Sequence, residues 1–100
     1  LIIINNQGGN IFKLIPGPQK LSELEQFFET KHAYNFEHLA NMHSCAYFTA
    51  SNIEELRIKF SNFIQEANES AILEIKTNGD TSAQSLRAYF EYLKQEINLN

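Results

Sequence analysis

The sequence predicts an α/β fold: a partial three-layer sandwich in which a mostly parallel sheet is flanked by helices. Short β-branched or aromatic runs alternate along the chain with longer segments whose apolar residues recur at helical spacing. Such alternation is typical of parallel sheets, because two parallel strands need a long crossover between them, usually a helix. The runs with strand character predict a small open sheet, whose other strands would precede residue 1.

The first third of the chain predicts one strand, one polar turn and one short helix. Leu1–Ile4 is a continuous apolar run, typical of a strand buried on both faces. Residues 5–10 are polar with two glycines, and the next apolar run, 11–15, ends at the breaker Pro16-Gly17-Pro18. A capping box at Ser22–Glu25 starts a helix that continues to about Thr30. Its inner face would carry Leu24, Phe27 and Phe28.

The middle of the chain predicts a short helix, a strand and a longer helix. Asn35 can cap the short helix, and residues 45–49 follow as a strand. A second capping box at Ser51–Glu54 starts the long helix. The short helix would turn inward Phe36, Leu39, Ala40 and His43. The long helix has an apolar stripe of Ile53, Leu56, Phe60, Phe63, Ile64 and Ala67, opposite Glu55, Lys59, Asn62 and Glu66.

The last third of the chain predicts a strand, a turn and a helix. Residues 71–75 (AILEI) have strand character, and Asn78-Gly79-Asp80 is a turn. The final helix would start at Thr81 or Ser82. Its inward residues would be Leu86, Tyr89, Phe90, Leu93 and Ile97.

Composition excludes several classes of function. The 100 residues are 43% hydrophobic and 20% charged, with a net charge of −4 and no run of three basic residues, so no nucleic-acid surface is expected. No apolar run approaches the ~20 residues of a membrane helix. The single cysteine, Cys45, excludes an intrachain disulfide and a cysteine metal site, which favours a cytoplasmic setting. The start inside an apolar run, without Met, indicates a piece of a longer protein.

The polar turn is the candidate ligand site. Ligands of open α/β sheets bind beyond the carboxyl ends of strands, where residues 5–10 are expected. Asparagine side chains and main-chain carbonyls offer neutral oxygens, which Mg²⁺ accepts when substrate phosphates complete its shell. From spacing alone, a plain turn without a ligand is the more common outcome, because Asn and Gly are ordinary turn residues. The familiar phosphate loops, GxxxxGK[ST] and GxGxxG, are absent.

The string NNQGGNIFKLIP after an apolar strand resembles the C-terminal part of the thiamine-diphosphate-dependent enzymes. It is most similar to the SEPHCHC (2-succinyl-5-enolpyruvyl-6-hydroxy-3-cyclohexene-1-carboxylate) synthases, bacterial enzymes of menaquinone biosynthesis. The NNxGGxIFxx(Leu/Ile)P extension carries this resemblance, and NFEHLA, SxxEEL and ILEI extend it across the chain. It implies that residues 1–100 are the C-terminal part of a diphosphate-binding domain whose upstream domains are missing.

The resemblance also implies roles for individual residues. Asn6 would bind Mg²⁺ through its side-chain oxygen and Gly8 through its carbonyl, with the ion bridging to the diphosphate of thiamine diphosphate. Gly9 and Ile11 would contact the cofactor. The substrate pocket would be lined by Ile11, Phe12 and Ile15, an apolar wall that protects a carbanion from protonation.

The implied reaction is decarboxylation of 2-oxoglutarate and addition of the resulting carbanion to isochorismate, by a homo-oligomer (dimer or tetramer). The Gly-Asp-Gly half of the cofactor motif, with its Mg²⁺-binding aspartate, is absent, as is the glutamate that activates the cofactor. No catalytic residue is therefore expected within residues 1–100, and the fragment alone should be inactive.

Two alternatives remain open at this point. The chain could be the C-terminal domain of another thiamine-diphosphate enzyme, although the GGxIF extension argues against it. It could also be a non-catalytic α/β interaction module that uses Ile11–Phe12 and the sheet edge before Leu1 as its interface. His32, His38 and His43 lack zinc-pair spacing and, like Cys45, are expected to be structural.

Overall fold

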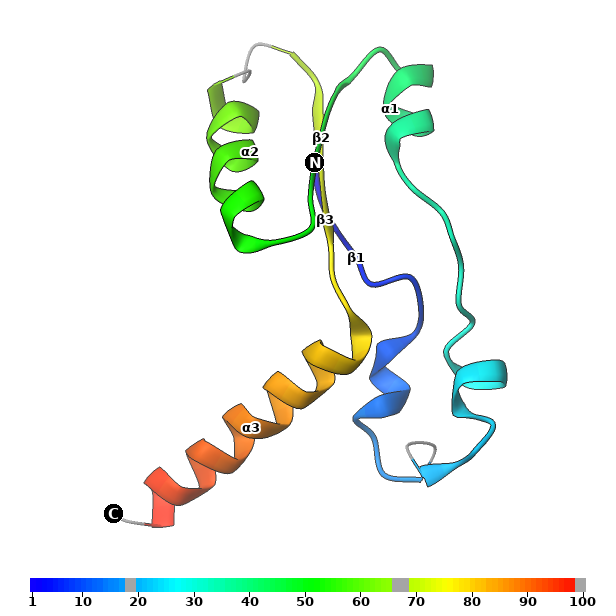
Figure 1. The fold of residues 1–100 in the computed structure, drawn as a ribbon, viewed down its shortest axis with the longest axis vertical. Helices are drawn as coiled ribbons and strands as arrows, with labels where there is room; N and C mark the ends of the chain where they lie inside the picture. The colour runs from blue at the N-terminus through cyan, green and yellow to red at the C-terminus, as the bar shows by residue number, and fades with distance from the viewer. Residues whose placement is uncertain (18–19, 66–68, 99–100) are drawn as a thin grey trace. The chain divides into compact units, whose positions relative to one another are not determined.

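The computed structural model describes residues 1–17, 20–65 and 69–98, and these form two compact units. One unit, here called the sheet unit, consists of residues 1–5 and 33–77. The other, here called the turn unit, consists of residues 6–32 and 78–98. The strands and α-helices of both units are labelled in Figure 1.

The sheet unit contains, within the described residues, three parallel strands in the order β1-β3-β2. They are β1 (Ile2–Asn5), β2 (Ala46–Ala50) and β3 (Ala71–Lys76). Helices α1 (Glu37–Met42) and α2 (Ile53–Gln65) lie on opposite sides of this sheet (Figure 1). The predicted α/β class with a parallel sheet flanked by helices is therefore confirmed.

One face of the sheet is apolar and packs on α2. Ile2 of β1 pairs with Leu73 of β3, which pairs in turn with Phe48 of β2, so all three side chains share this face. The Phe48 ring meets Phe63 of α2 edge-on, with ring centroids 6.3 Å apart. This contact places a core of the sheet unit between α2 and the two strands that it covers, and Leu73 is fully buried there.

Within the described residues, strand β1 is not buried on both faces as predicted. Leu1 and Ile4 are each 68% exposed, and Ile2 is exposed as well. The physical reason is position: β1 is an edge strand of the described sheet, and α2 packs on β2 and β3 instead. A continuous apolar run cannot by itself distinguish a central strand from an edge strand.

The other face of the sheet surrounds a buried carboxylate, Glu74 on the central strand. Its side chain is fully buried, and it accepts hydrogen bonds from the Asn5 amide at 2.6 Å and from the Phe36 main-chain N–H at 3.0 Å. The Tyr47 hydroxyl donates a third bond. Glu74 thus joins all three strands and the segment that leads into α1.

Hydrogen bonding decides the charge state of Glu74. Burial is the largest single influence and raises the pKa of the carboxyl, but the three donors and the charge of Lys76 together outweigh it, so the pKa lies below its usual range. The same environment acts on Tyr47 in the opposite sense: burial and the bond to Glu74 raise the pKa of its hydroxyl to about 12. The pair therefore consists of a carboxylate and a neutral phenol at neutral pH.

Helix α2 begins as a capped helix, one residue later than the predicted box. Asn52 Oδ1 accepts the Glu55 N–H at 2.8 Å, and the Glu55 carboxylate accepts the Ser51 N–H at 2.8 Å. Of the predicted stripe, Leu56 and Phe63 are half-buried, whereas Ile53, Phe60 and Ile64 are exposed. The stripe is covered only where α2 meets the strands. Glu66 and Ala67 of the prediction, like Pro18, lie outside the described residues.

The turn unit contains the short helices η1 (Asn10–Lys13) and η3 (Leu24–Phe28) and the long helix α3 (Gly79–Asn98). The helix predicted from Ser22 to Thr30 is only the five-residue π turn η3, and Ser22 does not cap it. Thr30 adopts the left-handed conformation with φ of 50°, which ends any helical continuation.

Helix α3 starts earlier than predicted, and its apolar side chains are not inward. Asn78 Oδ1 accepts the N–H groups of Asp80 and Thr81 at 2.9 and 3.0 Å, so the cap is Asn78 rather than Thr81 or Ser82. Within the described helix, Ala83 is the buried residue. The residues Leu86, Tyr89, Phe90 and Ile97 are exposed. The prediction of an inward stripe is thus wrong for these four residues.

Helix α1 confirms a short helix in the middle of the chain, but not its predicted cap. Phe36 occupies the N-cap position without a side-chain hydrogen bond, so Asn35 does not cap it. Ala40 is buried as predicted, and Leu39 is exposed. Ser44, with φ of 53°, ends the segment before β2.

We expect Glu74→Gln to lower the free energy of unfolding of the sheet unit by about 2 kcal/mol at pH 7, because charge-assisted hydrogen bonds are lost. The folded-state pKa of Glu74 lies below its unfolded value. Its contribution is therefore complete above the unfolded pKa of about 4.3 and is lost as the pH falls through the folded pKa. Hydrogen exchange of the β3 amides measures this loss at pH 7, and urea unfolding curves between pH 5 and pH 2 follow how the difference between the two proteins diminishes.

The matched control is Glu69→Gln, which changes an exposed glutamate of the same unit. It should change the free energy of unfolding by about 0.5 kcal/mol or less and leave the exchange rates of the β3 amides within about twofold of those of the unchanged protein. A Glu74→Gln difference of the same size at pH 7 and at pH 2 would contradict the assigned charge state.

Candidate functional site

The polar turn begins directly after β1 and is closed by the Asn6 side chain. Asn6 Oδ1 accepts the Gly8 N–H at 3.2 Å, and Gln7 between them adopts the left-handed conformation with φ of 57°. This is the local bond by which asparagine side chains stabilise turns. The turn therefore places the side-chain oxygen of Asn6 beside the main chain of Gly8.

The two glycines allow the main chain of Glu29 to approach the turn closely. The Gly9 N–H donates to the Glu29 carbonyl at 2.5 Å, and the His32 N–H donates to the Gln7 carbonyl at 3.1 Å. A Cβ atom at Gly8 would lie 3.1 Å from the Glu29 carbonyl oxygen, and one at Gly9 would lie 3.2 Å from it. Residues 29–32 thus support the turn through its main chain, and a Cβ atom at Gly8 or Gly9 would make a tight contact there.

Helix η1 carries the predicted apolar wall. Ile11 is 61% exposed, Ile15 is also exposed, and Phe12 is half-buried. The Phe12 ring packs edge-on against Phe28 of η3, with centroids 5.5 Å apart. Phe12 is therefore anchored within the turn unit, whereas Ile11 presents most of its surface outward.

Lys13, the last residue of η1, forms a buried ionic cluster. Its side chain is buried, and Nζ lies 2.8 Å from the carboxylate of Glu29, which is only 2% exposed. Nζ also pairs with Asp80 in the first turn of α3, and the Arg87 guanidinium donates to the Lys13 carbonyl. The hydrogen bond and the charge of Lys13 hold the pKa of Asp80 below its usual range.

Asn10, at the start of η1, packs against the start of α3. A Cβ atom on Gly79 would lie 2.2 Å from Asn10 Oδ1, so this contact requires glycine unless Asn10 moves. Asn10 Nδ2 is buried and donates no hydrogen bond within the described residues. Asn10 and Lys13 are the first and last residues of η1, so this contact and the Lys13–Asp80 pair join both ends of η1 to the start of α3.

The two oxygens predicted to bind Mg²⁺ both have acceptor capacity left. Asn6 Oδ1 accepts one hydrogen bond, and the Gly8 carbonyl accepts none from the described residues, so both oxygens retain acceptor capacity. Across the described ranges, no group of three His, Cys, Asp or Glu side chains could hold a metal ion. Two neutral oxygens alone bind Mg²⁺ weakly, since the ion usually relies on carboxylates and phosphates.

The structure brings all six predicted site residues into one unit, within the stretch Asn6–Ile15. Their assignment to a metal ion, a cofactor and a substrate remains a prediction. Sequence reasoning missed the residues that hold this stretch in place: Lys13, Glu29, Gly79 and Asp80. Lys13 carried one usable signal, because it is the single charge inside the apolar run IFKLI.

The other singled-out residues form no second site. His38 and His43 are exposed, and Cys45 is half-buried with its Sγ 3.6 Å from the His43 carbonyl. Within the described residues, no helix combines the length and apolar character that a membrane span requires.

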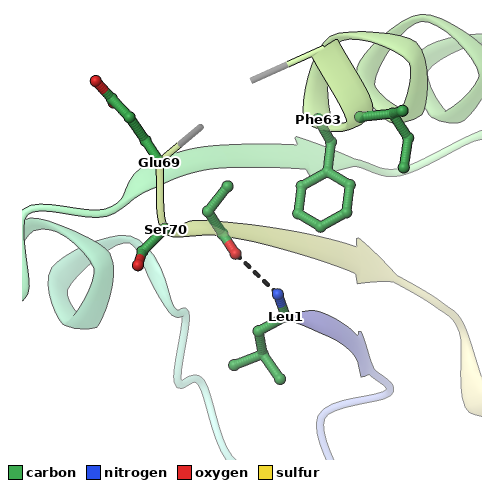
Figure 2. A pocket seen from close by; sticks show the side chains of 6 residues that line it. Leu1, Phe63, Glu69 and Ser70 are labelled. Carbon is green, nitrogen blue, oxygen red and sulfur yellow. Dashed lines mark hydrogen bonds between the residues drawn. The ribbon is translucent and has the colours of Figure 1, made fainter. Parts of the chain in front are cut away.

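A separate hollow of about 330 Å³ lies in the sheet unit beside the first residue (Figure 2). Its lining combines the end of α2 with the start of β3 and consists of Leu1, Phe63, Ile64, Glu69, Ser70 and Ala71. The Leu1 amino group donates to the Ala71 carbonyl at 2.9 Å, as the dashed line in Figure 2 shows. This hollow contains none of the predicted site residues.

The fold and the turn define a segment of an α/β protein with a glycine-containing polar turn directly after its first parallel strand. No family model matches the chain. Its relatives are nonetheless consistent: the chain is 36% identical over 93 residues to the SEPHCHC synthase of Flavobacterium johnsoniae and 34% identical over 96 residues to that of Porphyromonas gingivalis. It is 32% identical over 95 residues to that of Cytophaga hutchinsonii.

These matches cover 93%, 96% and 95% of the chain, and 17% of the length of each relative. The chain is therefore similar to SEPHCHC synthases over nearly all of its residues, and it spans about one sixth of the length of these relatives. The resemblance read from the NNxGGxIF string is thereby confirmed.

We expect Gly9→Ala to loosen the turn, because the new Cβ would lie 3.2 Å from the Glu29 carbonyl oxygen and 3.3 Å from the Phe12 ring. Overpacking of this kind costs about 1–3 kcal/mol. Hydrogen exchange should show faster exchange at the Gly9 and Phe12 amides. Ser85→Ala, an exposed substitution of similar size on α3, is the control. Unchanged exchange at both amides would show that the close approach to Glu29 does not constrain the turn.

Proposed function

We propose that the chain is the C-terminal part of the diphosphate-binding domain of a SEPHCHC synthase that requires thiamine diphosphate and Mg²⁺. The full-length enzyme would decarboxylate 2-oxoglutarate and add the resulting four-carbon unit to isochorismate in bacterial menaquinone biosynthesis. The observation that carries the proposal is the turn itself, which places Asn6 Oδ1 beside the main chain of Gly8 with acceptor capacity on both oxygens. Similarity to SEPHCHC synthases over nearly the whole chain supports the same conclusion.

The residues of the turn have separable tasks in this proposal. Asn6 and the Gly8 carbonyl supply two neutral ligands to Mg²⁺, and Gly9 lets the main chain approach the cofactor. Thiamine diphosphate, when bound, supplies the electron sink that the decarboxylation needs. Ile11, Phe12 and Ile15 exclude water from the reacting atoms, and the exposed surface of Ile11 is available for that contact.

The proposal assigns part of a site to this chain rather than a complete one. The described residues offer no carboxylate cluster for Mg²⁺, so the aspartate of a Gly-Asp-Gly motif and the activating glutamate belong upstream. The enzyme is proposed to work as a homo-oligomer in the cytoplasm, with a site completed by a second subunit. The 100 residues alone are therefore expected to be inactive.

Two alternative functions remain. The exposed apolar side chains of β1, with the hollow beside Leu1, favour a non-catalytic module that packs against a partner. Another thiamine-diphosphate enzyme would share the turn but use different substrates. Calorimetric titration of the full-length protein with Mg²⁺ and thiamine diphosphate separates the classes, because a partner module would show no heat of binding.

We expect Asn6→Leu in the full-length protein to weaken the binding of thiamine diphosphate in the presence of Mg²⁺ by about tenfold or more, because a ligand oxygen is lost. Asn6→Asp keeps an oxygen at this position and should retain binding. Asn62→Leu, which changes an exposed asparagine of α2, is the control and should leave the affinity unchanged. Equal affinity of Asn6→Leu and the unchanged protein would show that Asn6 is not a ligand.

A further inference from the structure

We infer that Glu29 is a positioning residue, which orients the apolar wall of the proposed pocket through its carboxylate and supports the proposed metal-binding turn through its main chain. This inference rests on the proposed function for what the wall and the turn do. The contacts of Glu29 with Lys13, at the end of η1, and with the turn lie within the turn unit, so they can be tested without any ligand.

The main chain of Glu29 holds the first half of the stretch Asn6–Ile15. Its carbonyl accepts the Gly9 N–H at 2.5 Å, and its oxygen would lie 3.1 Å from a Cβ atom on Gly8 and 3.2 Å from one on Gly9. This contact belongs to the backbone, so any side chain at position 29 that leaves the backbone in place would preserve it. The oxygens of Asn6 and Gly8 depend on this half of the support.

The side chain of Glu29 holds the second half of the same stretch. Its carboxylate lies 2.8 Å from Nζ of Lys13, and both side chains are buried. Lys13 ends η1, the helix that carries Ile11 and Phe12. Removing one partner of a buried ion pair strongly destabilises the fold, because the other charge is left buried and unpaired. The Glu29 carboxylate therefore fixes Lys13 and with it the position of η1.

The other charged partners of Lys13 and Glu29 are exposed, so the pair that these two residues form with each other contributes most to holding η1. Asp80 also pairs with Lys13, but its side chain is 67% exposed and therefore weakly held. Lys31 approaches Glu29 only to 3.7 Å from an exposed position. The buried pair Lys13–Glu29 is thus the part of the cluster that water and salt screen least.

The division between main chain and side chain makes a sharp prediction for Glu29→Gln. The backbone contact to Gly9 is kept, whereas the charge that holds Lys13 is removed. The affinity for thiamine diphosphate with Mg²⁺ should therefore stay within about twofold, while turnover of 2-oxoglutarate falls by about tenfold or its KM rises by that factor, as expected when an aligned wall is misplaced.

A ligand-free measurement tests the structural half of the inference. In the full-length protein without cofactor, Glu29→Gln should speed hydrogen exchange by about tenfold at Leu14 and Ile15, whose N–H groups bond to the Ile11 carbonyl within η1. Exchange of the Gly9 amide, which bonds to the main chain of Glu29, should change less. The β3 amides report whether the substitution unfolds the protein generally.

Two further variants complete the design. Lys13→Met combined with Glu29→Gln removes both charges and should recover part of the loss, because no unpaired buried charge remains. Glu91→Gln breaks the exposed 2.6 Å pair with Lys94 on α3 and should have no effect on exchange or turnover.

The outcomes separate this inference from the proposed function. Faster exchange in η1 with preserved cofactor affinity and impaired turnover supports it. Unchanged exchange in η1, or an equal loss of cofactor affinity and turnover, overturns it. If the unchanged full-length protein binds no thiamine diphosphate, the proposed function fails, while the exchange data still decide whether Glu29 holds η1.

Discussion

The carboxylate of Glu74 is the interaction on which the sheet unit depends. It lies on the central strand and accepts bonds from β1 through Asn5, from β2 through Tyr47 and from the segment before α1 through the Phe36 main chain. A buried charge costs free energy unless donors surround it, so these groups must come together for the strand order to form. Helix α2 then covers the opposite face, where Phe48 meets Phe63.

The turn unit uses the same physical principle around a different carboxylate. Glu29 is buried beside Lys13, and its main-chain carbonyl also lies close to the two glycines of the turn, Gly8 and Gly9. A short stretch with little regular structure is thereby held by one charge pair, one close backbone contact and the Phe12–Phe28 packing. Pre-organised loops of this kind suit ligand sites, because less order has to be created on binding.

Much of the organisation was predictable because it is local. The parallel α/β class, the strands at 45–49 and 71–75 and the helix that follows Ser51 come from periodicity and caps, which act over a few residues. The six site residues were predicted from the NNQGGNIFKLI string, and they do share one unit. The helix after Ser22 was not predicted correctly, since Thr30 turns left-handed and the chain instead delivers Glu29 to the turn.

The sequence by itself determined the fold class, the resemblance to SEPHCHC synthases and the position of the polar turn, because strand and turn chemistry is set by neighbouring residues. Only the tertiary structure decided that β1 is an exposed edge, that Asn78 starts α3 and that Lys13 pairs with Glu29 across sixteen positions of the chain. Burial and ion pairing depend on which distant segments meet, and no local pattern in Leu1–Ile4 or around Glu29 contains that information.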